Sequence, residues 1–352
     1  MPVGSLAFMI PGDLEALTGG YEYDRRIIGE LRRLGWTVDV ESLDASFPDP
    51  TPFAREDARR RFASRADGSV VMVDGLAFGA LAVEAEDECR RLRFVALIHH
   101  PLADETGIDG RLARSLETSE RRALATTRAV VVTSRPTADG LARYGVSRDR
   151  IAVVEPGTDP ASLAHGSAEG SVHLLCVASL IPRKGHEVLV DALARIAPQS
   201  WHLTCVGSLD RDPPTASRVR ALLAQYDLTD RVTFTGDLRQ PQLDREYDRA
   251  DVFVLPTFHE GYGMVVGEAL ARGLPVVSCP TGAIAELVTA NAGVLVSPGN
   301  AAELASALET VVGNRDVRLQ LAAGARQVRD RLPTWDTAAR RMAAALDRAG
   351  RS

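Results

Sequence analysis

Charged residues and glycines meet in two loops of the sequence. Arg183 and Lys184 stand directly before Gly185, and Glu260 and Glu268 flank a glycine-rich turn with seven residues between them. Arginine binds a phosphate through two donors, and lysine provides a compact positive charge. A carboxylate accepts two hydroxyl groups at once. The two loops together therefore suit a ligand that carries both a diphosphate and sugar hydroxyls.

Lys184 is the only lysine in a chain that contains 41 lysine and arginine residues. Codon bias in a GC-rich genome would explain the excess of arginine, but it does not explain why one lysine is kept in this loop. A solvated turn is the alternative interpretation of the loop. The position of the single lysine argues against that alternative.

The second loop begins where an apolar run ends, and a helix is expected to follow it over residues 264–272. Gly261 and Gly263 have no side chain, so the backbone there can approach a ligand closely. The N-terminus of the helix offers unpaired N–H groups and the positive end of its dipole to a diphosphate. Glu268 is expected on the polar side of this helix. The core side is assigned to Val265, Val266, Ala269 and Leu270. The alternative is a pair of surface acids beside an ordinary helix start.

The first half of the chain offers two further candidates. Gly19 and Gly20 precede an expected helix, so the backbone there could approach a phosphate. His99 and His100 follow an expected strand at residues 94–98. A histidine at the end of such a strand could donate to a leaving phosphate or to a sugar hydroxyl. A histidine that only satisfies its own loop is the alternative.

Short apolar runs alternate with amphipathic helical windows along the whole chain, which is typical of α/β proteins with parallel sheets. We expect two doubly wound, Rossmann-like domains over residues 1–165 and 171–332, and a last helix within residues 333–352. The stretch 156–171 is rich in Gly, Pro, Ser and Ala and is the expected linker. A cleft between the carboxyl ends of the strands of the two domains would hold the ligand.

The expected elements follow from this alternation. Strands are expected at residues 5–10, 37–40, 70–73, 94–98, 129–133, 151–154, 172–178, 201–206, 232–235, 252–255, 275–278 and 293–296. Helices are expected at residues 21–34, 187–196, 218–226, 264–272, 301–312, 317–331 and 334–349. The arginine run at residues 59–61, which follows Glu56 and Asp57, is interpreted as the solvated face of a helix.

Composition and charge exclude several classes of protein. The net charge of −6 argues against nucleic acid as a partner, because a phosphate backbone requires a basic surface. No apolar run reaches the roughly 18 to 20 residues of a membrane span, which leaves only peripheral membrane contact open. The four cysteines show no metal-ligand spacing, and the first residues do not resemble a signal peptide. We therefore expect a cytoplasmic location.

Several segments of the sequence resemble glycosyltransferase family 4. Residues 259–288 resemble the family's E-x7-E signature, with Glu260 and Glu268 as its two acids, and read HEGYGMVVGEALARGLPVVSCPTGAIAELV. Residues 174–193 resemble its donor-phosphate loop and read LLCVASLIPRKGHEVLVDAL. The glycine loop is matched by TGGYEYD, and further similar segments are VVVTSRPTADGL, VVEPGTD and RVTFTGDL. The resemblance covers nearly the whole chain.

This resemblance implies an enzyme with the GT-B fold, a hexosyltransferase with the acceptor on the first domain and the last helix packed back on that domain. The donor would be a nucleoside diphosphate sugar, and the acceptor a small molecule or the end of a glycan chain, since the first domain is short. Transfer would retain the anomeric configuration and need neither a metal nor a cofactor. The Asp210-Arg211-Asp212 segment spells the DxD of metal-dependent glycosyltransferases, and we interpret that match as fortuitous.

The resemblance also assigns roles to individual residues. Arg183 and Lys184 would bind the donor diphosphate, Glu268 the ribose hydroxyls, and Glu260 the hydroxyls of the transferred sugar. His99 is the better match to the family's strand-end histidine, and His100 is the fallback. The remaining donor contacts would come from Gly20, Gly261, Tyr262, Gly263 and Met264.

The sequence departs from the family pattern at a few positions. Gly267 stands before Glu268 in place of a larger apolar residue, while Tyr262 and Met264 replace the commoner Phe and Leu. We expect these changes to adjust how the sugar fits without abolishing transfer.

Three other functions fit the sequence less well. An NAD-dependent dehydrogenase would need a GxGxxG loop after the first strand, and the sequence PGDLEALTGG there does not fit. A GT-B nucleotide-sugar epimerase should carry acids in its first-domain loops in place of the E-x7-E segment. A non-catalytic nucleotide-sugar-binding protein would lack the strand-end histidine.

Overall fold

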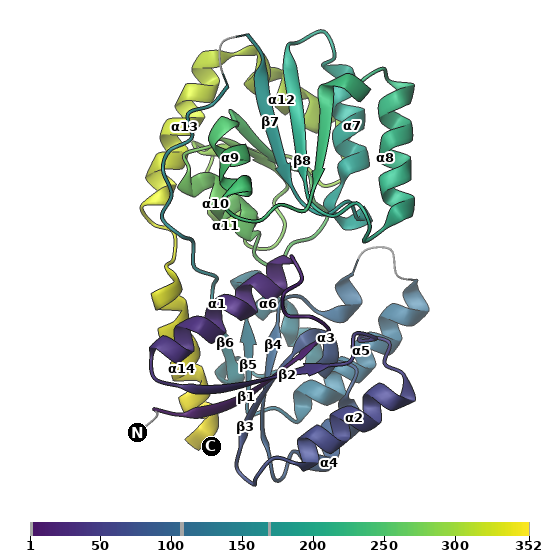
Figure 1. The fold of residues 1–352 in the computed structure, drawn as a ribbon, viewed down its shortest axis with the longest axis vertical. Coiled ribbons are helices and arrows are strands. Elements are labelled where there is room, and N and C mark those ends of the chain that lie inside the picture. Colours follow the sequence, from purple (N-terminus) through teal and green to yellow (C-terminus); the bar gives the residue numbers. More distant parts are fainter. Residues whose placement is uncertain (1–2, 106–108, 168–169, 352) are drawn as a thin grey trace. The chain divides into compact units, whose positions relative to one another are not determined.

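The computed structural model describes residues 3–105, 109–167 and 170–351. The chain forms two compact units: unit 1 consists of residues 1–157 and 333–352, and unit 2 of residues 158–332. Each unit contains one six-stranded sheet, and every pair of neighbouring strands is parallel (Figure 1).

Unit 1 has the strand order β2-β1-β3-β4-β5-β6. Its strands are β1 (Ser5–Pro11), β2 (Thr37–Leu43), β3 (Val70–Asp74), β4 (Arg93–Ile98), β5 (Ala129–Val132) and β6 (Ile151–Val153). Its helices are α1 (Gly19–Arg33), α2 (Pro52–Ala63), α3 (Gly75–Phe78), α4 (Ala82–Glu88), α5 (Gly110–Ala125), α6 (Arg135–Gly140) and α14 (Trp335–Arg351), with short 3₁₀ turns at Leu102–Asp104, Leu141–Tyr144 and Arg148–Arg150. The central strands are apolar on both faces, because helices cover both faces of a parallel sheet.

The C-terminal helix α14 belongs to unit 1, where it packs against α1 and along β3 to β6. At its first residue, the Trp335 ring lies 6.0 Å from the ring of Tyr23 on α1, and the Arg26 guanidinium lies 4.9 Å above the same indole. The Tyr23 hydroxyl donates to the Val154 carbonyl at 3.0 Å. These contacts fix the start of α14 beside α1.

Unit 2 has the strand order β12-β11-β10-β7-β8-β9. Its strands are β7 (Val172–Val177), β8 (Trp201–Val206), β9 (Val232–Gly236), β10 (Val252–Leu255), β11 (Val276–Ser278) and β12 (Gly293–Leu295). Its helices are α7 (His186–Arg195), α8 (Pro213–Gln225), α9 (Gln242–Arg249), α10 (Met264–Ala271), α11 (Ile284–Leu287), α12 (Ala301–Gly313) and α13 (Arg315–Arg329), with 3₁₀ turns at Pro182–Lys184 and Thr229–Arg231.

One predicted helix begins earlier than expected. The prediction placed its start at residue 218, whereas α8 begins at Pro213. Proline is tolerated in the first turn of a helix because its missing N–H has no partner there in any case. The Asp212 side chain caps this helix by accepting from the Thr215 N–H at 2.8 Å, so the second acid of the DxD segment has a structural role.

In each sheet the chain reverses its direction of winding between two neighbouring strands. This reversal lies between β1 and β3 in unit 1 and between β7 and β10 in unit 2. Loops that leave such strands at their carboxyl ends diverge, and ligands of open α/β sheets bind there. Among the described residues, no helix is both long enough and apolar enough to cross a membrane.

Candidate functional site

The loops after β7 and β10 meet at the reversal point of unit 2. Gly185 has a φ of +69°, and a Cβ added to it would lie 2.1 Å from the Pro256 carbonyl oxygen. Only glycine therefore permits this close approach of the two loops. The Phe258 N–H also donates to the Arg183 carbonyl at 2.8 Å, which fixes the register of one loop against the other.

A buried ion pair joins the two loops through their charged side chains. Lys184 Nζ lies 2.5 Å from Glu260 Oε1, and Arg183 Nη1 lies 3.7 Å from the same oxygen. Arg183 Nη1 also donates to the His259 carbonyl at 2.8 Å. The three side chains are only 10 to 16% exposed. The structure thus brings together the two predicted cations and the first predicted acid, which carry one net positive charge.

The electrostatic balance of this group favours the ionised form of Glu260. Burial raises the pKa of the Glu260 carboxyl, but Lys184 and Arg183 together outweigh burial, so that the pKa lies below its ordinary value. The Glu260 carboxylate is therefore ionised at neutral pH. A buried charge of this kind is tolerated only while it is paired.

Glu268 lies on α10 and has different partners. Its Oε2 accepts a hydrogen bond of 2.9 Å from the hydroxyl of Tyr247 on α9. The Arg272 guanidinium lies 4.4 Å above the Tyr247 ring and pairs with Asp244. Tyr247 is fully buried, so it holds the carboxylate in a fixed orientation. The sequence does not point to Tyr247, because helix α9 is short and mostly polar and shows no apolar period.

The glycine-rich turn before α10 adopts the geometry that its composition predicts. Gly263 caps the helix with a φ of +87°. A Cβ on Gly282 would lie 1.9 Å from the Glu260 carbonyl oxygen, so the backbone at Gly282 packs directly against this turn. Within the turn, Gly261 and Met264 are half-buried and Tyr262 is buried.

Gly267, one of the departures from the family pattern, packs against Thr158 at the start of unit 2. A Cβ there would lie 3.0 Å from Thr158 Oγ1. The space that a larger side chain would occupy is therefore taken by Thr158, which relates this departure to packing.

The predicted residues of unit 1 gather at the reversal point of their own sheet. His99 follows β4, and a Cβ on Gly20 would lie 3.5 Å from its imidazole. Two acids that the sequence analysis did not single out flank His99: its Nε2 lies 3.4 Å from Asp24 Oδ1 and 3.5 Å from Asp74 Oδ2. His100 points elsewhere, with its Nε2 3.2 Å from Glu105 Oε2. The structure thus separates the two histidines by their partners.

Among the described residues, Asp24, Asp74 and His99 are also the one group whose ligand atoms have metal-ligand spacing, all within 4.8 Å of one another. The acids of the DxD segment do not belong to it.

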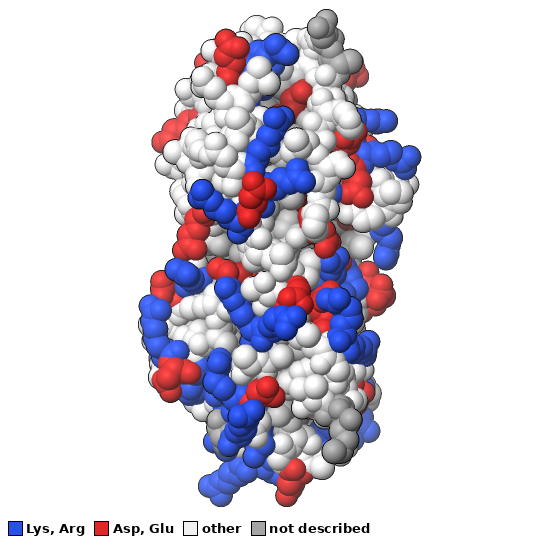
Figure 2. Space-filling view, turned by 90° about the vertical axis from the view of Figure 1, so that its left-hand side faces the viewer, with Lys and Arg blue, Asp and Glu red and all other residues white. Residues whose placement is uncertain are grey.

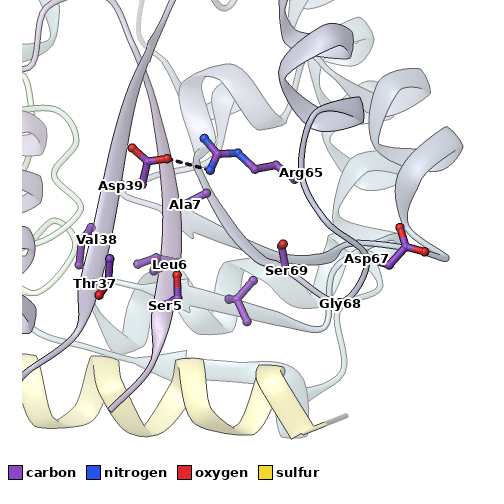
Figure 3. A pocket seen from close by; sticks show the side chains of 11 residues that line it. Ser5, Leu6, Ala7, Thr37, Val38, Asp39, Arg65, Asp67, Gly68 and Ser69 are labelled. Carbon is purple, nitrogen blue, oxygen red and sulfur yellow. Dashed lines mark hydrogen bonds and ion pairs between the residues drawn. The ribbon is translucent and has the colours of Figure 1, made fainter. Parts of the chain in front are cut away.

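A pocket lies at the amino ends of β1, β2 and β3 (Figure 3), whereas Asp74 and His99 lie at the carboxyl ends of their strands. Arg65 donates to Asp39 at 2.7 Å at its side. None of the predicted site residues lines this pocket.

Over the face drawn in Figure 2, Lys and Arg side chains are interspersed with Asp and Glu side chains, as on an ordinary solvated surface.

Two family models match consecutive parts of the chain. The model described as Glycosyltransferase Family 4 matches residues 46–162, and the model described as Glycosyl transferases group 1 matches residues 171–314.

Curated relatives extend this similarity. The chain is 31% identical over 209 residues to a D-inositol 3-phosphate glycosyltransferase of Pseudarthrobacter chlorophenolicus, which covers 55% of this chain and 49% of the relative. It is 25% identical over 334 residues to an MMP alpha-(1->4)-mannosyltransferase of Mycolicibacterium hassiacum, which covers 89% of this chain and 79% of the relative. The match thus spans about half the length of the D-inositol 3-phosphate glycosyltransferase.

Solved structures share the fold of the whole chain. Sucrose-phosphate synthase from Thermosynechococcus elongatus superposes with a TM-score of 0.79 at 23% identity, covering 96% of this chain and 97% of that one. Anabaena HepE in complex with UDP-glucose gives a TM-score of 0.77 at 19% identity, covering 97% and 99%. The two parallel six-stranded sheets and these neighbours define the GT-B fold. The chain belongs to glycosyltransferase family 4.

The buried pair predicts a pH-dependent contribution of Lys184 to stability. Because the folded-state pKa of Glu260 is lowered, the stabilisation by the pair is present above the ordinary value of 4.5 and is lost as the pH falls through the folded-state value. Lys184→Met should lower the free energy of unfolding by about 1–3 kcal/mol at pH 7, where it leaves a buried carboxylate short of a partner. The difference should shrink at pH 4, and urea unfolding at both values measures it.

A double-mutant cycle with Glu260→Gln provides the control. The two substitutions should be strongly non-additive at pH 7, because each removes the same interaction. Additive effects, or an equal loss at both pH values, would contradict a stabilising charge pair.

Proposed function

We propose that the chain is a retaining glycosyltransferase that moves a hexosyl unit from a nucleoside diphosphate sugar to a hydroxyl acceptor without a metal ion. The observation that carries this proposal is the cluster of Arg183, Lys184 and Glu260 at the reversal point of unit 2. Two cations and one carboxylate lie there beside the N-terminus of α10. The cluster provides positive charge for a diphosphate and a carboxylate for hydroxyl groups.

The reaction breaks the bond between the anomeric carbon and a phosphate oxygen of the donor, and it forms a bond from the acceptor oxygen to the same face of that carbon. The acceptor proton passes to the departing diphosphate, which becomes the more basic group as it leaves. Arg183, Lys184 and the helix N-terminus stabilise the negative charge that develops on the diphosphate. This is the charge that a metal ion neutralises in other transferases, so these residues take the place of the metal.

Glu260 and Glu268 would divide the hydroxyl groups of the donor between them. Glu260 is placed beside the phosphate-binding cations and would accept from the transferred sugar. Glu268 lies just over one turn into α10 and would accept from the ribose. The hydrogen bond from Tyr247 to Glu268 Oε2 would prepare that carboxylate for its partner.

The relatives support this class of donor and acceptor. One 32% identical relative is named a GDP-mannose-dependent alpha-(1-6)-phosphatidylinositol monomannoside mannosyltransferase, and the HepE structure holds UDP-glucose. The names of the relatives include both a small phosphorylated acceptor and a glycolipid acceptor. We infer that this chain likewise uses a nucleoside diphosphate sugar as donor and a small molecule or the end of a glycan chain as acceptor.

A panel of UDP, GDP and ADP sugars tests the donor site. One nucleotide class should raise the thermal midpoint of the protein, because a ligand of the folded state stabilises it. Lys184→Met should remove that shift at the same ligand concentration. Arg220→Met, which removes an exposed cation from α8 of the same unit, should leave the shift unchanged. Equal shifts for wild type and Lys184→Met would contradict the assignment.

Metal independence and stereochemistry are tested together with the donor that the panel identifies. Transfer should proceed at the same rate in excess EDTA, and NMR of the product should show the anomeric configuration of the donor. Loss of activity on chelation, with recovery on adding Mg²⁺ or Mn²⁺, would contradict the metal-free mechanism. Donor binding without any transfer would favour a non-catalytic nucleotide-sugar-binding protein.

Tyr247→Phe tests the orientation of Glu268. The substitution removes only the hydroxyl, so the donor KM should rise by about tenfold, which corresponds to one hydrogen bond to a charged group. Because the ribose lies away from the reacting carbon, kcat should change much less. Tyr226→Phe removes an exposed hydroxyl that bonds to Asp191 at 3.0 Å, and it should change neither constant. An unchanged KM in Tyr247→Phe would contradict a role in donor binding for Glu268 held by Tyr247.

A further inference from the structure

Three titratable side chains from three elements meet at the reversal point of unit 1. Asp24 comes from the second turn of α1, Asp74 ends β3, and His99 directly follows β4. The Nε2 atom of His99 faces both carboxylates, at 3.4 Å from Asp24 and 3.5 Å from Asp74. No role proposed above accounts for the two acids.

Asp24 is the unusual member of this group. Its side chain is 0% exposed, and neither carboxylate oxygen has a hydrogen-bond partner. Asp74 differs, because its Oδ1 accepts from the Leu76 N–H at 2.8 Å and thereby caps α3. A buried carboxylate without hydrogen bonds is strongly destabilising unless a positive charge compensates it. His99 can supply that charge in its protonated form.

The orientation of the imidazole follows from which atoms are buried. Nε2 is buried and faces the two carboxylates, yet the His99 side chain is 22% exposed. The exposed part of the side chain therefore lies away from Nε2. Tyr23 fixes the ring from the side, with an edge-to-face contact of 5.4 Å between ring centroids.

The charges around the ring favour the imidazolium. Burial lowers the pKa of His99, but Asp24 and Asp74 outweigh burial and raise the pKa to about 10. Burial raises the pKa of Asp24 to about 6 against the opposing effect of His99, with Asp74 and Arg25 acting on it in opposite directions. Tyr23 stays neutral, because burial raises its pKa well above the ordinary value. These pKa shifts favour a protonated His99 beside an ionised Asp24 at neutral pH.

A divalent cation is the competing occupant of this group, since the three ligand atoms lie within 4.8 Å of one another. A metal would require a neutral imidazole with a lone pair on Nε2. Two carboxylates that face Nε2 at 3.4 and 3.5 Å favour a proton on that nitrogen. The ion pair therefore accounts for the three side chains without a further component.

We propose that Asp24 is a positioning residue that keeps His99 as a fixed imidazolium with Nε2 turned inward, so that His99 acts as a cationic hydrogen-bond donor through its exposed edge and not as a general base. This inference rests on the proposed function, because that function supplies the group that accepts the hydrogen bond from His99. That group is a phosphate oxygen or a sugar hydroxyl. It adds the charge state of the histidine and the residue that sets it. It also agrees with a reaction in which the departing diphosphate takes the acceptor proton.

Selective ¹³C,¹⁵N-histidine labelling tests the charge state without any turnover. The His99 signal is assigned by its loss in His99→Asn. In the wild type it should stay protonated above pH 8, whereas in Asp24→Asn the pKa should fall by about one unit or more. Asp24→Glu, which restores the charge, should keep the pKa high. A wild-type His99 that titrates near the ordinary value of 6.5 overturns the proposal, even if Asp24→Asn does not fold.

The pH profile of the reaction separates positioning from a general structural role. In Asp24→Asn the basic limb of kcat should move to lower pH while activity near pH 6 is largely kept, because His99 is still protonated there. A uniform loss at every pH, without displacement of that limb, contradicts the proposal. Zinc that binds stoichiometrically and shifts the His99 signal would assign the group to a metal instead. If the NMR result holds but no donor supports transfer, the proposed function fails and the charge state stands.

Discussion

The buried pair of Lys184 and Glu260 is the interaction on which the candidate site of unit 2 depends. It joins the loops that follow β7 and β10, at the place where the strand order of unit 2 reverses. Each charge is tolerated in the interior because the other is present, and Arg183 adds a second cation to the same oxygen. The close approach at Gly185 makes the pairing geometrically available. The residues that we propose for donor binding therefore also contribute to local stability.

The charged groups at the reversal points of the two sheets are arranged in opposite ways. At the reversal point of unit 2, two cations surround one carboxylate, which leaves positive charge for an anionic ligand. At the reversal point of unit 1, two carboxylates face one histidine, which favours the protonated form of that histidine. In both cases a parallel sheet places the ends of neighbouring strands side by side, and residues distant in the sequence become partners.

Much of the fold could be predicted from the sequence, because short continuous apolar runs such as residues 94–98 are typical of buried parallel strands. Short helices such as α3 and α9 have too few turns to show a period. The Lys184–Glu260 contact spans 76 positions in the sequence, so only the tertiary fold reveals it. Asp24 did leave a signal: it precedes Ile27, Ile28 and Leu31 at helical spacing and thus lies on the buried face of α1. Tyr247 left none.

The most direct test of the account uses the fact that Lys184 is the only lysine of the chain. Protein labelled with ¹³C,¹⁵N-lysine gives a single lysine side-chain signal, which reports on the pair with Glu260 without further assignment. Titration with the nucleoside diphosphate of the matching donor should move this signal to saturation, and Glu260→Gln should displace it before ligand is added. A signal that none of UDP, GDP and ADP perturbs, with or without a sugar attached, would contradict the claim that this pair forms the donor diphosphate site.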